Sequence, residues 1–148
     1  MTVPSIDDLS GLVVDECIRI HRELGPGLLE SVYETVLAGA LARQGVTVDR
    51  QAPVDIEYDG MRFVAAFRID LLVDQRLVVE IKSVEALKNL HAKQLLTYLR
   101  LTDREVGLLL NFSGETMREG IRRVVNNHGQ APRPSAPPRL CESKYGES

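Results

Sequence analysis

The sequence predicts a single α/β (α+β) domain in which helices flank a mixed sheet. A length of 148 residues fits one domain, and a hydrophobic content of 44% is enough to build its core. The spacing of apolar residues changes along the chain from helical to strand-like and back. This change of period favours an α/β or α+β architecture over an all-α or all-β one.

Helical spacing, with apolar residues at every third or fourth position, occurs in residues 6–24, 28–44 and 85–101. The first helix should end at Gly25 and Pro26, because glycine accepts a left-handed cap and proline cannot continue the hydrogen-bond ladder. The second helix is expected to bury a stripe formed by Leu29, Val32, Val36, Ala40 and Leu41. This stripe predicts which side of the second helix faces the core.

Strands are expected in residues 46–58, 62–73, 77–82, 106–112 and 120–125. Pro53 interrupts the first of them, which therefore forms one or two strands. Asp59 and Gly60 are typical of a tight hairpin turn. Counted with two strands in the first segment, the predicted order is α-α-β-β-β-β-α-β-β.

The predicted domain covers residues 1–127, and the proline-rich residues 128–148 are expected to form a disordered tail. Cys17 and Cys141 are too few and too far apart in sequence for a disulfide framework or a zinc cluster, which is typical of a reducing cytoplasm. No apolar run is long enough for a membrane span, and the N-terminus lacks the pattern of a secretory signal. We therefore expect a cytoplasmic protein without a membrane partner.

Charge is unevenly distributed along a chain whose formal net charge is −3. This net charge argues against a histone-like protein that binds nucleic acid without regard to sequence. Residues 1–35 carry an excess of five negative charges, whereas residues 76–104 carry an excess of three positive charges. The basic segment leaves contact with a polyanion open.

The segment with the clearest chemical pattern contains Asp70, Glu80 and Lys82. Strand alternation places Glu80 and Lys82 on one face, at the end of an almost wholly apolar run. Pairing with the preceding strand would bring Asp70 beside them, and two neighbouring carboxylates favour a divalent cation. The alternative is a Glu–Lys pair at a strand end with an unrelated aspartate.

The same residues resemble a known nuclease pattern. Asp70 followed by Glu80-Ile81-Lys82 is similar to the D…(D/E)-x-K signature of the PD-(D/E)XK nuclease superfamily. Ile69 stands where that signature usually has proline.

A second motif lies at the start of the second predicted helix. Gly27, Glu30 and Tyr33 have the spacing that names the GxxExxY family, a small prokaryotic branch of the same superfamily. The resemblance covers about residues 10–126. It implies a restriction-endonuclease-like αβββαβ core with a mixed sheet.

The resemblance also implies an enzyme that hydrolyses phosphodiester bonds, with DNA as the expected substrate. Glu30, Asp70, Glu80 and the backbone carbonyl of Ile81 would hold one or two Mg²⁺ (or Mn²⁺) ions. Lys82 would position the attacking water and screen charge on the phosphate. Glu30 has an alternative role as a first-turn carboxylate that interacts with the helix dipole.

Three further side chains are expected to support the site. Gln94 corresponds to a recurrent glutamine of the superfamily, although it could equally be an exposed helix position. Tyr98 lies on the same polar edge of the third helix. Tyr33 is interpreted as a packing residue whose hydroxyl bonds a site carboxylate. Glu34 is interpreted as its solvated neighbour, with a metal ligand as the less favoured alternative.

A second class of function stays open at this stage. The acidic chain has few aromatic residues, which is compatible with a catalytically silent nucleic-acid-binding or protein-interaction module that keeps the nuclease fold. So small a domain could also act as a homodimer or as a subunit of a larger assembly. The sequence does not discriminate DNA from RNA or endonucleolytic from exonucleolytic cleavage.

Overall fold

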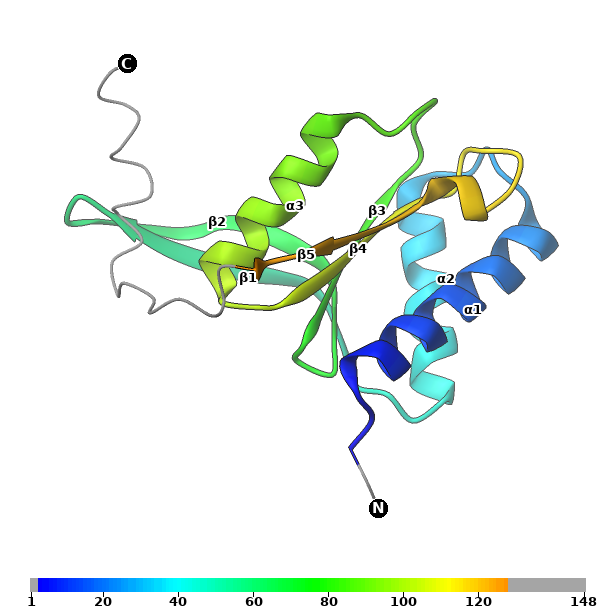
Figure 1. Ribbon diagram of the computed structural model, residues 1–148, viewed down its shortest axis with the longest axis horizontal. Helices are drawn as coiled ribbons and strands as arrows, with labels where there is room; N and C mark the ends of the chain where they lie inside the picture. The colour runs from blue at the N-terminus through cyan, green and yellow to red at the C-terminus, as the bar shows by residue number, and fades with distance from the viewer. Residues whose placement is uncertain (1–2, 128–148) are drawn as a thin grey trace.

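The structure, a computed structural model, describes residues 3–127 (Figure 1). These residues form a five-stranded sheet of order β1-β2-β3-β4-β5, three α-helices and a short 3₁₀ helix. The helices are α1 (Ile6–Leu24), α2 (Glu30–Arg43), α3 (Asn89–Thr102) and η1 (Arg118–Gly120). The strands are β1 (Val48–Tyr58), β2 (Met61–Val73), β3 (Leu77–Lys82), β4 (Val106–Asn111) and β5 (Ile121–Val125).

Strands β3 and β4 are parallel, and the other neighbouring strands are antiparallel. The predicted mixed-sheet α+β class is therefore confirmed. None of the helices within residues 3–127 has the length and hydrophobicity of a membrane span. The predicted disordered tail, residues 128–148, and Cys141 lie outside the described residues.

The sheet separates two hydrophobic cores. Helices α1 and α2 pack on one face, where Leu71 and Val79 lie in the larger core (Figure 1). Helix α3 packs on the other face, where its Leu95 and Leu99 contact Val78 and its neighbours. Complete burial of each such side chain contributes about 1.5–3 kcal/mol. The C-terminal end of β3 is thus fixed between two packed layers.

Residues 46–58 contain one strand, β1, rather than two. Pro53 stays in register opposite Arg68 of β2. Proline lacks an N–H group and is tolerated in edge strands. Strand β1 is an edge strand, so no further strand on its outer side needs this donor.

Helix α3 begins at Asn89, four residues later than the sequence predicts. The preceding segment is held as a loop by long-range hydrogen bonds. The side-chain amide of Asn111 donates to the Val84 carbonyl and accepts from the Val84 N–H group. These tertiary contacts override the helical spacing of apolar residues in this segment.

Helix α2 buries the end of the predicted stripe, Ala40 and Leu41, but its buried face is rotated away from the start of that stripe. Tyr33, Leu37 and Leu41 are fully buried, whereas Leu29 is 74% exposed and Val32 is 38% exposed. Apolar side chains lie on several sides of this helix, so their spacing alone does not select the buried side. The rotation also brings Glu34 to the buried side.

Gly120 marks a close approach between η1 and the end of β4. A Cβ atom there would collide with the main-chain carbonyl of Asn111. We expect Gly120→Ala to lower the free energy of unfolding by at least about 2 kcal/mol, because backbone atoms would have to move.

Urea unfolding of both proteins would measure the difference. The control is Gly11→Ala at an exposed position of α1, where a Cβ atom would meet nothing within 4 Å. That change should raise stability by about 0.5–1 kcal/mol. Equal stability of Gly120→Ala and the parent protein would contradict the prediction.

Candidate active site

Strands β2 and β3 pair next to the turn that joins them and separate halfway along β3. The candidate site lies in the opening between them. Their ladder continues as far as the pair Leu71 and Val79. Ile69 and Leu72 lie in the same core, although strand alternation would place them on opposite faces. The alternation therefore breaks at Asp70, and the irregular backbone turns this side chain toward β3.

Asp70 and Glu80 meet in this opening through hydrogen bonds between side chain and backbone. The Ile81 N–H group donates to Asp70 Oδ2 at 2.9 Å. The Asp70 N–H group donates to Glu80 Oε2 at 3.3 Å. In an extended strand the N–H and C=O groups of one residue point to the same edge, so the Ile81 carbonyl also faces β2. The structure thus gathers two carboxylates and one carbonyl.

Glu80 is held in conditions that favour its neutral form. Its exposed fraction is 6%. Burial, assisted by the negative charge of Asp70, raises the pKa of Glu80 to about 8. The Asp70 N–H group and the Lys82 charge act in the opposite direction but do not compensate. Without a cation, the pair therefore keeps a proton near neutral pH.

Lys82 and Tyr98 complete the α3 side of the site. Val78 packs beneath α3, so strand alternation places Glu80 and Lys82 on the same face. Burial, followed by the charges of Glu80 and Asp70, raises the pKa of Tyr98. Tyr98 therefore lies within electrostatic reach of both carboxylates, and its ring stacks on that of Phe67 with centroids 4.1 Å apart.

Glu30 lies at the C-terminal end of β3 but contacts the backbone instead of the carboxylate pair. Its Oε2 accepts a hydrogen bond of 3.1 Å from the Ser83 N–H group. The Ser83 hydroxyl donates to the carbonyl of Leu28. These bonds attach the segment after Lys82 to the start of α2. The role of Glu30 as a metal ligand stays a prediction.

Tyr33 packs in the core as predicted, but its hydroxyl does not bond a site carboxylate. It donates to the Gly25 carbonyl at 2.6 Å and accepts from the Leu28 N–H group at 3.1 Å. The ring is fully buried and stacks on Phe112. The preceding loop therefore occupies the hydroxyl, and Tyr33 supports the site by holding this loop at the start of α2.

Gln94 is exposed to solvent, whereas Glu34 is buried. Gln94 is exposed on α3, and its side chain makes no hydrogen bond within the described part of the chain. Glu34, interpreted from sequence as solvated, is 7% exposed and forms an ion pair of 3.2 Å with Arg50. The solvated interpretation of Glu34 is wrong because α2 turns this side chain toward β1.

Gln51 is a site residue that the sequence analysis missed. Its side-chain amide donates to Glu34 Oε1 at 2.8 Å and to Asp70 Oδ1 at 3.1 Å. No local motif marks Gln51, and its only sequence signal is a polar residue two positions before Pro53 in an otherwise ordinary edge strand.

The donors in the opening fit a hard divalent cation. Mg²⁺ is usually bound by one or two carboxylates and keeps several waters, so Asp70, Glu80 and the Ile81 carbonyl make a suitable set. Residues 3–127 contain no group of three or more His, Cys, Asp or Glu side chains that could hold a metal. The fit therefore rests on the Asp70–Glu80 pair and leaves coordination positions for water and substrate.

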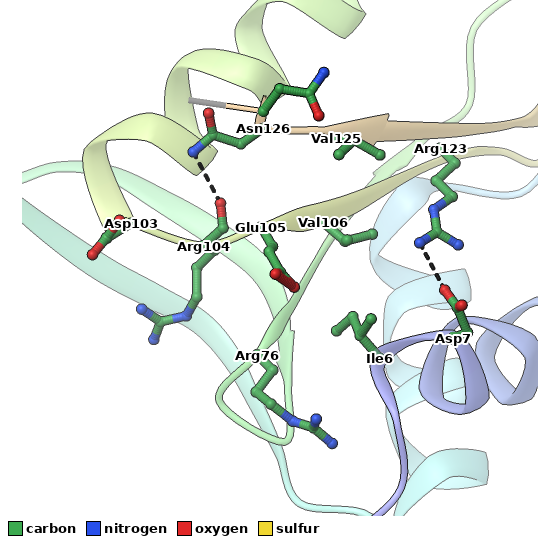
Figure 2. A pocket seen from close by; sticks show the side chains of 11 residues that line it. Ile6, Asp7, Arg76, Asp103, Arg104, Glu105, Val106, Arg123, Val125 and Asn126 are labelled. Atoms are coloured by element: carbon green, nitrogen blue, oxygen red, sulfur yellow. Dashed lines mark hydrogen bonds and ion pairs between the residues drawn. The ribbon is translucent and has the colours of Figure 1, made fainter. Parts of the chain in front are cut away.

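A pocket of about 610 Å³ lies at the opposite end of β3 and β4 and contains none of the predicted site residues (Figure 2). Its charged side chains are largely paired with one another or with neighbours. Arg123 binds Asp7 at 2.8 Å, and Arg76 binds Asp74 at 2.9 Å. This pocket is therefore separate from the carboxylate pair.

A family model described as the PD-(D/E)XK nuclease superfamily matches residues 7–124, which include the whole sheet opening. No curated protein and no solved structure gives a significant match.

Proposed function

The chain belongs to the PD-(D/E)XK nuclease superfamily, and we propose that it is a nuclease that hydrolyses DNA with Mg²⁺ or Mn²⁺. The observation that carries this proposal is the meeting of Asp70 and Glu80 between β2 and β3. A second carboxylate beside the buried Glu80 is unfavourable unless a proton or a cation neutralises the pair. A divalent cation would supply this charge and also serve phosphodiester hydrolysis.

Asp70, Glu80 and the Ile81 carbonyl would hold the ion. A bound divalent ion lowers the pKa of a water ligand and neutralises the phosphate. Within the protein, the Ile81 N–H group holds Asp70 Oδ2, which leaves the remaining carboxylate lone pairs for coordination. Glu80 would have to give up its proton to hold the ion, because metal ligands bind in their deprotonated form.

Lys82 would act on the reacting groups directly. It lies two residues after Glu80 on the same strand face. An ammonium group there can orient the attacking water and stabilise negative charge that develops on the phosphate. Tyr98 lies near both carboxylates and would help to orient water or phosphate through its hydroxyl.

We also place the chain in the GxxExxY branch, on the spacing of Gly27, Glu30 and Tyr33. Tyr33 holds the loop between α1 and α2, and Glu30 holds the segment after Lys82. Two residues of the motif would therefore act by positioning the end of β3 and the loop beside it. A direct contact of Glu30 with a metal ion remains part of the proposal.

Exposed cations near the site support a nucleic-acid substrate. Arg68 lies on β2 two residues before Asp70, and Lys93 lies on α3 five residues before Tyr98. Such side chains can contact phosphates on either side of the scissile bond. One small domain offers little surface for a duplex, so we further propose that a homodimer or a partner subunit completes DNA binding.

Incubation of the full chain with nucleic acids tests the proposal. Supercoiled, linear duplex and single-stranded DNA, together with RNA, are each supplied with Mg²⁺, Mn²⁺ or EDTA. We expect cleavage of DNA with either metal and none with EDTA. Cleavage of RNA alone would overturn DNA as the substrate, and tight Mn²⁺ binding without any cleavage would favour the silent nucleic-acid-binding module.

A further inference from the structure

We infer that Gln51 is a positioning residue that sets the metal affinity of the Asp70–Glu80 pair, an inference that rests on the proposed function. Its amide donates to Asp70 Oδ1, while the Ile81 N–H group donates to Oδ2. Each oxygen of Asp70 is therefore fixed by one donor. A carboxylate restrained at both oxygens offers its free lone pairs in one orientation, which favours a cation that demands regular geometry.

The amide of Gln51 is itself anchored from helix α2. It also donates to Glu34 Oε1, and Arg50 holds the other oxygen of Glu34 at 3.2 Å. The second guanidinium nitrogen of Arg50 donates to Thr35 Oγ1 at 2.9 Å. A continuous set of contacts thus runs from α2 to Asp70. Since Arg50 compensates the charge of Glu34, this support adds no net charge beside the metal pair.

The backbone of Gln51 gives an independent indication that its position is specified. Its φ angle is 50°, in the left-handed region that residues other than glycine rarely adopt. Arg50 and Ala52 remain in register with β2 on either side. Within this stretch of β1, the unusual conformation is therefore confined to the residue whose side chain reaches Asp70.

Gln75 provides a matched control at a distance from the site. It also has a positive φ angle, 59°, and its side-chain amide also donates to an aspartate, Asp49. Gln51→Leu and Gln75→Leu therefore remove the same chemical group from the same backbone conformation. Only the first change removes a donor from Asp70, so any difference in metal binding reports the contact with the site.

Calorimetric titration of the full chain with Mn²⁺ compares these two variants with the parent protein and Asp70→Asn. We expect Gln51→Leu to weaken Mn²⁺ binding by about tenfold, as loss of a contact behind a ligand does. Gln75→Leu should bind as the parent does. Cleavage by Gln51→Leu should recover at saturating Mn²⁺, a rescue that a purely structural defect would not show.

Unchanged Mn²⁺ affinity in Gln51→Leu, or an equal loss in Gln75→Leu, would overturn the positioning role. If Asp70→Asn loses Mn²⁺ binding in the same experiment, the metal site and the proposed function stand without it. If Asp70→Asn binds Mn²⁺ as the parent does, the metal site is wrong, and both the proposed function and this inference fail.

Discussion

Lys82→Ala is expected to reduce the rate of DNA cleavage by about 10²–10³-fold while the protein remains folded and binds Mn²⁺. Loss of one preorganised group that stabilises charge in the transition state commonly has an effect of this size. Lys82 is partly exposed at the end of β3, so its removal leaves no large cavity in either core. Single-turnover cleavage at saturating Mn²⁺ measures the effect on the chemical step.

Two companion variants show whether the effect belongs to the site. Lys93→Ala removes an exposed cation from α3 and should change mainly substrate affinity and its salt dependence. Asp70→Asn should lose Mn²⁺ binding together with cleavage. Cleavage by Lys82→Ala at the parent rate would refute the role of Lys82 in the reaction.

Glu80→Gln is expected to stabilise the metal-free protein at alkaline pH. In the folded chain burial, with the charge of Asp70, raises the pKa of Glu80 to about 8, whereas an ordinary glutamate has a value of 4.5. Between these values the folded state binds more protons than the unfolded state, so the parent protein loses stability as pH rises. The full loss, reached above pH 8, is up to about 5 kcal/mol.

Glutamine does not titrate and resembles the neutral glutamic acid. The two proteins should therefore have similar unfolding free energies near pH 4 and diverge as pH rises toward 9. Denaturant unfolding at several pH values, in EDTA, gives this difference directly. Both proteins keep the charged or titratable groups that act on Glu80 or respond to it, which are Asp70, Lys82 and Tyr98.

Asp55 offers a control of opposite sign on the β1–β2 hairpin. The Ala65 N–H group, followed by Arg62, lowers the pKa of Asp55. The stabilising contribution of Asp55 is therefore present above its usual pKa and is lost as pH falls, so Asp55→Asn should be the less stable protein at neutral pH. A constant difference between Glu80→Gln and the parent protein from pH 5 to 9 would exclude the raised pKa of Glu80.

Local pattern was sufficient for most of the fold and for the carboxylate pair. The predicted bounds of α1 and β3 agree with the structure because both segments have clear periodicity and clear end signals. The short turn between β2 and β3 makes them adjacent antiparallel strands, which brings Asp70 beside Glu80. These features depend on residues close together in sequence.

The rest of the site depends on contacts between distant residues. Gln51 reaches Asp70 across the pairing of β1 with β2, at a point where its own backbone is left-handed, and neither the register nor this conformation has a local sequence signature. Glu34 was placed in solvent because α2 has apolar residues on several sides. Likewise, Asn111 keeps residues near Val84 out of α3 through contacts across the sheet.

The central claim is that Asp70 and Glu80 exchange a shared proton for a divalent cation. The most direct test is the heat of Mn²⁺ binding at pH 7, measured in buffers that differ in ionisation enthalpy. A pKa of about 8 for Glu80 predicts the release of about one proton per ion in the parent protein. Mn²⁺ binding whose heat is the same in every buffer, or no binding at all, would contradict the claim.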